Sequence, residues 1–392
     1  MERGGALSEK MKLFWTNPRY RYYRIALFFL LLVVVTDVAV RVYFLRRGIV
    51  DRNPGNTTAA MDYLFGQMKR AKHPKVVFIG SSVTQGYGNC PPGKHFPCLV
   101  GKELRKYPQY KNARTFNLSS AGNRFGDHFG NMVESNRYQP DLFVIAIHLK
   151  MFSVHSSLID PITHDEVLYY FRDEPDYQRG GPKDLFKRFR VKDERYRQIW
   201  LDFQMKQISG LYKYRRLIGY LISGQHQLPA AAMSDRLRAW LGILDEIMVE
   251  SYDTTHEERN ADYLWKVIPS HVVQLNYHQC EAFDFSDENI GWLTFKDLCE
   301  YGQKNNLNIL FFINPINHDF VDQKQFFDWG EVMPLFKQRI LSVTRQYGYQ
   351  VVDCTDRIDP RYFSDLDHLN MNGHKQMTQI LMPHILTALR RK

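Results

Sequence analysis

Two short segments near opposite ends of the chain hold a serine, a histidine and a carboxylate, the residue types of a nucleophilic enzyme. Ser81 and Ser82 follow an apolar run in KVVFIGSSV, and Asp365 and His368 stand three apart in FSDLDHLNMNGH. A serine hydroxyl is a weak nucleophile at neutral pH and needs an adjacent base. The D-x-x-H spacing can place the carboxylate on one ring nitrogen and leave the other for the serine. We therefore assign Ser82 as nucleophile, His368 as general base and then acid, and Asp365 as the group that orients it.

Each of these residues also has a plainer interpretation. A serine after a strand is often a helix cap or a turn residue, and Asp365 and His368 could be turn residues. Asp367 also neighbours His368, and we rank it below Asp365 as the orienting group. The combination of Gly-Ser-Ser after one strand with Asp-x-x-His before the last helix favours catalysis, provided that the fold brings the two together.

An alternation of apolar runs and helical patterns predicts the sheet that would do so. Five strand candidates are KVVFIGSS, ARTFNLSS, DLFVIAIHL, NILFFINPIN and YQVVDCTD. Helical patterns lie between or after them, near 97–109, 127–138, 293–306, 321–347 and 371–390. Continuous apolar runs mark strands covered on both faces of a parallel sheet. We predict an α/β fold, a three-layer α/β/α sandwich with a five-stranded parallel sheet of the flavodoxin-like kind.

Polar residues follow several of these strands, where ligands bind in parallel sheets. Asn123 and Arg124 follow the second strand, Lys150 the third and Asn314 the fourth. We take these four as candidate substrate contacts, with ordinary surface charge as the alternative for Arg124 and Lys150.

An apolar stretch near the N-terminus divides the chain. Residues 25–45 read IALFFLLLVVVTDVAVRVYFL and are long enough to span a bilayer as a helix, with arginines on both sides. We predict a cytoplasmic tail over 1–24, a transmembrane signal anchor over 25–45 and a connector over 46–72. Residues 73–392 then form an extracytoplasmic domain with a largely helical insertion at about 151–292. Inside the span, Asp37 and Arg41 either pair with each other or contact a second membrane protein.

The net charge and the spacing of the cysteines limit the kinds of partner, metal and cofactor that we expect. A net charge of +10 favours anionic partners, and the anchor favours an anionic envelope polymer or glycan over nucleic acid. The five cysteines show no zinc spacing, so we expect no metal site and no cofactor. A disulfide between Cys90 and Cys98 could close the loop PPGKHFP, although sequence alone does not determine the pairing.

These motifs resemble those of the SGNH/GDSL hydrolase superfamily. GSSV, Gly80 to Val83, matches its first motif and assigns the nucleophile to Ser82 rather than Ser81. Gly122 matches the glycine after the second strand, and Asp365 to His368 match the last motif. The G-x-N-D motif is absent, since IHLKMF stands there. The resemblance therefore implies an oxyanion hole built on the backbone N–H groups of Ser82 and Gly122, with Lys150 or Asn123 as further candidates.

A narrower resemblance is to the membrane-anchored D-alanine transfer proteins, the DltD-type branch. It lies in the single span, the GSS triplet and the segment YFSDLDHLNMNG. This resemblance implies acyl transfer to an envelope polymer, such as D-alanylation of teichoic acid or acetylation of a glycan. It also implies a membrane-bound O-acyltransferase and an acyl carrier protein system as partners. The alternatives are a simple envelope esterase and a noncatalytic docking or assembly partner of an acyltransferase.

Overall fold

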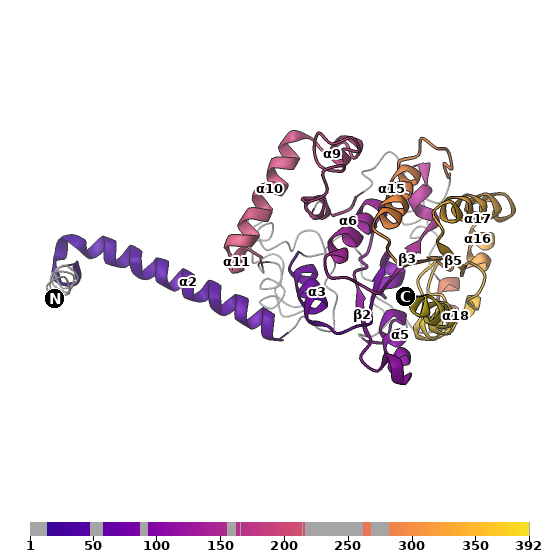
Figure 1. Cartoon of the computed structure of the whole chain (residues 1–392), viewed down its shortest axis with the longest axis horizontal. Helices are drawn as coiled ribbons and strands as arrows, with labels where there is room; N and C mark the ends of the chain where they lie inside the picture. The colour runs from indigo at the N-terminus through magenta and orange to yellow at the C-terminus, as the bar shows by residue number, and fades with distance from the viewer. Residues whose placement is uncertain are drawn as a thin grey trace. The chain divides into compact units, whose positions relative to one another are not determined.

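The chain divides into two compact units, one comprising Met1–Gly48 with Gln204–Val249 and the other Ile49–Phe203 with Glu250–Lys392. The computed structural model describes residues 14–47, 58–86, 93–154, 162–164, 166–213, 215, 262–267 and 282–391 (Figure 1).

The second unit contains a five-stranded, wholly parallel sheet, which confirms the predicted fold class. Its strands are β1 (Lys75–Ile79), β2 (Arg114–Asn117), β3 (Leu142–Ile147), β4 (Ile309–Ile313) and β5 (Gln350–Asp353). Their spatial order is β2-β1-β3-β4-β5. The three central strands are buried along their whole length, whereas the edge strands β2 and β5 are only partly buried. The order reverses between β1 and β3, and in open parallel sheets ligands bind beside such a reversal.

Helices cover both faces of this sheet. The main ones are α5 (Phe96–Leu104), α6 (Phe125–Asn136), α15 (Ile290–Lys304), α17 (Trp329–Gln346) and α18 (Met371–Arg390). Successive residues of β4 point to opposite faces: the ring of Phe312 contacts Phe96 of α5, and that of Phe311 contacts Phe295 of α15. Helix α18 packs against α5, and α15 packs against α6. The result is a three-layer sandwich.

One predicted helix is two helices in the structure. The sequence pattern predicts a helix near 321–347, but α16 (His318–Lys324) ends before α17 begins. Gln325 has a left-handed backbone with φ of 52°, which stops α16. The side chain of Asp328 then accepts a hydrogen bond from the N–H of Glu331 and caps α17.

The segment assigned to a connector also contains a helix, α3 (Thr58–Arg70). Met61, Phe65 and Met68 lie on one face of it and are almost fully buried in the core of the second unit. Their spacing of four and three residues is typical of a helix face. The polar residues that precede Met61 are typical of a connector, so the sequence pattern did not predict this helix.

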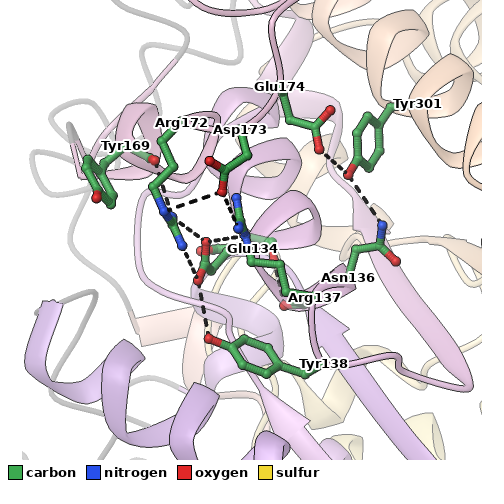
Figure 2. Close-up of polar contacts among 11 residues, drawn as sticks. Glu134, Asn136, Arg137, Tyr138, Tyr169, Arg172, Asp173, Glu174 and Tyr301 are labelled. Atoms are coloured by element: carbon green, nitrogen blue, oxygen red, sulfur yellow. Dashed lines mark hydrogen bonds and ion pairs between the residues drawn. The ribbon is translucent and has the colours of Figure 1, made fainter.

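A buried carboxylate joins helix α6 to the part of the insertion that follows residue 165 (Figure 2). Glu134 of α6 has a 7 % exposed side chain and lies 2.7 Å from Arg172 and 3.0 Å from Arg137. Arg137 also pairs with Asp173. Since the two arginines come from both sides of this junction, the carboxylate fixes the insertion to the sheet-covering helix.

Replacing Glu134 with alanine should destabilise the protein by about 2–3 kcal/mol, because two partly buried guanidinium groups lose their buried carboxylate and keep only the exposed Asp173 as a counter-charge. Thermal or urea unfolding of the purified protein measures this. The control is Glu103→Ala, which removes an exposed ion pair with Lys106 and should change stability by less than about 1 kcal/mol. Equal effects of the two substitutions would contradict the assignment of Glu134 as a structural junction.

The first unit contains helix α2 (Arg21–Arg47). Within the described residues, Pro18–Val40 is long and apolar enough to cross a membrane. Asp37 accepts hydrogen bonds from the hydroxyl of Ser209 and the N–H of Leu211, each 2.8 Å long. Asp37 thus has partners within its own chain, and the side chain of Arg41 lies outside the described part.

Candidate active site

Ser82 lies three residues after Ile79, the last residue of β1. Gly80 and Ser81 leave the strand, and Ser82 is the first residue of the short helix α4 (Ser82–Gln85). The Gly80 carbonyl accepts hydrogen bonds from the N–H of Ser120 and from the side chain of Asn123, both in the loop after β2. A Cβ atom on Gly80 would lie 2.2 Å from Oγ1 of Thr84, so only glycine fits this turn.

The loop before α18 places the histidine and its carboxylate. An isolated antiparallel bridge joins Phe363 to Leu369, and the N–H of Ser364 donates to the carbonyl of His368. Asn317, after β4, donates through its side chain to the carbonyl of Asp365. The loop is therefore closed on itself and braced from a neighbouring strand.

These elements bring the three predicted residues together. Nε2 of His368 lies 2.8 Å from Oγ of Ser82, and Nδ1 of His368 lies 2.7 Å from Oδ2 of Asp365. The other oxygen of Asp365 accepts the backbone N–H groups of His368 and Asp367. Ser82 and His368 are partly exposed, so a substrate can reach the hydroxyl. The order serine, histidine, aspartate is the arrangement of a serine nucleophile with its base.

The electrostatics of the site favour a charged histidine. Burial acts to lower the pKa of His368, but Asp365 and Asp367 outweigh it and raise the pKa to about 9. Burial acts to raise the pKa of Asp365, and the charge and hydrogen bonds of His368 outweigh it and lower that pKa. The site therefore stabilises the imidazolium that forms when the histidine accepts the proton of serine.

Asp367 has a place in the site that the sequence did not assign to it. Its Oδ1 lies 3.2 Å from Nδ1 of His368, the nitrogen that Asp365 also contacts. Its Oδ2 contacts Nε2 of His148 and, at 2.9 Å, the ammonium of Lys150. Lys150, a candidate substrate contact, thus directs its charge to an internal carboxylate. The signal available in the sequence was the doubled carboxylate of DLDH.

The loop after β2 places Gly122 with a left-handed backbone, φ of 74°. Its carbonyl accepts a hydrogen bond from the Thr163 hydroxyl. The buried Asp127 of α6 accepts hydrogen bonds from the backbone N–H groups of Arg124, Thr163 and His164. These bonds connect the loop to the insertion. Thr163 and Asp127 had no motif in the sequence to mark them. The oxyanion role of Ser82 and Gly122 stays a prediction.

The remaining candidates are buried or bonded to nearby backbone, and their role in substrate binding stays a prediction. The Asn123 side chain is 3 % exposed and bonds to Gly80, and Arg124 is the N-cap residue of α6. Asn314 is 1 % exposed; its backbone N–H donates to the carbonyl of Ile147, and its side-chain amide makes no hydrogen bond to the described residues. Cys90 lies outside the described residues, so the suggested bridge to Cys98 stays a prediction.

Among the described residues, one group of side chains has the donor set of a metal site: Asp365, Asp367 and His368, with ligand atoms within 4.8 Å of one another. All three already bond to protein groups, and a cation there would compete with the ammonium of Lys150. The donors fit the proton chemistry of a serine–histidine pair better than they fit a cation.

Comparison with known proteins gives structural likeness only. No family model matches the chain. No curated protein matches it either. Similar solved structures include an acetyl xylan esterase, with 11% identity, a TM-score of 0.35, and coverage of 79% of this chain and 99% of that one. A putative lipolytic protein of the G-D-S-L family from Desulfitobacterium hafniense has 10% identity, a TM-score of 0.33, and coverage of 79% and 99%. A putative acylhydrolase from Bacteroides fragilis has 11% identity, a TM-score of 0.35, and coverage of 83% and 95%.

Proposed function

We propose that the protein is a membrane-anchored serine acyltransferase or esterase that works through an acyl-enzyme on Ser82. The observation that carries the proposal is the geometry of the site: Nε2 of His368 lies within hydrogen-bond distance of Oγ of Ser82, and Asp365 holds the opposite nitrogen. The resemblance of the GSSV and DLDH motifs to those of SGNH hydrolases supports the same chemistry.

The reaction has two steps. Oγ of Ser82 attacks the acyl carbonyl while His368 accepts the hydroxyl proton and returns it to the leaving alcohol. The backbone N–H groups of Ser82 and Gly122 would stabilise the oxyanion. In the second step His368 deprotonates either a hydroxyl of the acceptor, which gives transfer, or water, which gives hydrolysis. The activated oxygen attacks the acyl carbonyl, the bond from the acyl group to Oγ of Ser82 breaks, and His368 returns the proton to Oγ.

We favour transfer of an acyl group to an anionic envelope polymer or glycan, on the outer face of the cytoplasmic membrane. The apolar helix α2 and the net positive charge support this location and this class of acceptor. A membrane-bound O-acyltransferase, fed by an acyl carrier protein system, would supply the acyl group. D-alanylation and acetylation are both compatible with the site.

The test is Ser82→Ala in cells and in the purified protein. A serine-reactive phosphonate should label the parent protein and the Ser81→Ala control but not Ser82→Ala, because only Ser82 faces the histidine. In cells, loss of ester from the envelope polymer supports transfer, and an increase supports hydrolysis. Unchanged ester content, with no labelling of the parent protein, would contradict catalysis and favour the noncatalytic docking function.

A further inference from the structure

The end of β3 supplies a second set of polar groups to the site. His148 follows the strand directly and Lys150 lies two residues on, in the turn that begins after the strand. In the family that this chain resembles, an asparagine motif stands here. In this protein both side chains are directed to Asp367, whose side chain is only 3 % exposed.

The hydrogen bonds define the orientation of each group. The backbone N–H of Lys150 donates to Nδ1 of His148, so a neutral His148 carries its proton on Nε2 and donates it to Asp367. Burial lowers the pKa of His148, which keeps the ring neutral. The ammonium of Lys150 donates to the same carboxylate oxygen. These two donors occupy Oδ2 and leave Oδ1 of Asp367, which makes no hydrogen bond to the described residues and lies 3.2 Å from Nδ1 of His368.

We infer that Asp367 is a second positioning carboxylate for the general base, held in place by His148 and Lys150. This inference rests on the proposed function and goes beyond it. With Asp365, Asp367 and Lys150 charged, the cluster carries one net negative charge when His368 is neutral and none when His368 is protonated. Asp367 therefore sets how strongly the base retains its proton, while Asp365 fixes its orientation through a shorter contact.

Two neutral groups on described helices also act at His368. Ser82 contacts it from α4, and His374, on α18, interacts with it electrostatically. Burial lowers the pKa of His374 to about 3, so that ring is neutral at working pH. The pKa of His368 is thus set by burial and Lys150, which lower it, against the two carboxylates, which raise it and outweigh them.

The test is the pH dependence of the labelling rate with the phosphonate probe, which needs neutral His368 and no natural substrate. In the parent protein the rate should rise with pH up to about 9, the pKa of His368. Asp367→Asn should shift this rise of the labelling rate to a pH about one unit lower. Its rate at pH 7 should then rise by up to about tenfold, because more of the base is neutral, while the plateau at high pH falls. Lys150→Met should shift the rise of the labelling rate to higher pH and slow labelling at pH 7.

The control is Asp356→Asn, which removes a carboxylate that pairs with Lys337 and should leave the rise of the labelling rate at the same pH. A purely structural role for Asp367 would lower the rate evenly at all pH values, and an unshifted rise in Asp367→Asn overturns the inference. So does a shift of Lys150→Met in the same direction as Asp367→Asn. Failure of the proposed function itself is distinct, because the parent protein would then show no labelling at Ser82.

Discussion

Asp365→Asn should lower kcat/KM for an activated ester by about three orders of magnitude. The carboxylate accepts Nδ1–H of His368, which leaves Nε2 free to take the proton from Ser82. An asparagine can turn its amide toward Nδ1, which favours the tautomer with the proton on Nε2. That tautomer donates to the serine and cannot activate it.

The neighbouring Asp367 sets the size of this effect. Its oxygen lies 3.2 Å from the same nitrogen and can retain part of the population in the correct tautomer. The double variant Asp365→Asn/Asp367→Asn should therefore lose about a further factor of ten. Steady-state hydrolysis at each variant's pH optimum measures this, with Asp356→Asn as the control of equal charge change. If Asp365→Asn kept activity within tenfold of the parent and Asp367→Asn lost it, the roles of the two carboxylates would be exchanged.

Gly80→Ala should be the most damaging substitution outside the triad. The new methyl group would lie 2.2 Å from Oγ1 of Thr84 and 3.0 Å from Cβ of Ala146, both in buried positions. Helix α4 begins only two residues later, so relief of the clash displaces Ser82. We expect a loss of stability of about 1–3 kcal/mol and a fall in kcat of at least about 100-fold.

Unfolding and ester hydrolysis, measured on the same preparation, separate the two effects. Gly66→Ala is the matched control, because a methyl group there meets only the end of Arg70, 3.9 Å away. Gly66 lies inside α3, where alanine is favoured over glycine, so this variant should be as stable as the parent or slightly more stable. A Gly80→Ala protein with parent-like activity would show that the turn after β1 does not fix the nucleophile.

The sheet and the triad could be predicted because their signals are local. Each strand is a short apolar run between helical patterns, and the carboxyl ends of parallel strands share one edge. Gly80-Ser-Ser and Asp365-x-x-His therefore had to converge if the alternation was read correctly. The helix break at Gln325 had no glycine or proline to mark it, so α16 and α17 were read as one helix.

The second carboxylate was harder to predict for a different reason. Asp365 and Asp367 are two residues apart in a tight turn, and their directions depend on backbone angles that the sequence does not reveal. The contact between His148 and Asp367 joins residues that are 219 positions apart. No periodicity connects such residues, and the departure from the G-x-N-D motif indicated only that something else stands there.

The contact of Asp37 with Ser209 and Leu211 joins the apolar helix to a segment about 170 residues later in the chain. The apolar helix and residues 204–249 belong to one unit, so the chain passes between the two units after residues 48, 203 and 249. A single cut in the segment that follows the helix would separate the helix covalently from the rest of the chain, and the hydrogen bonds of Asp37 to Ser209 and Leu211 are noncovalent contacts that would still join the two fragments.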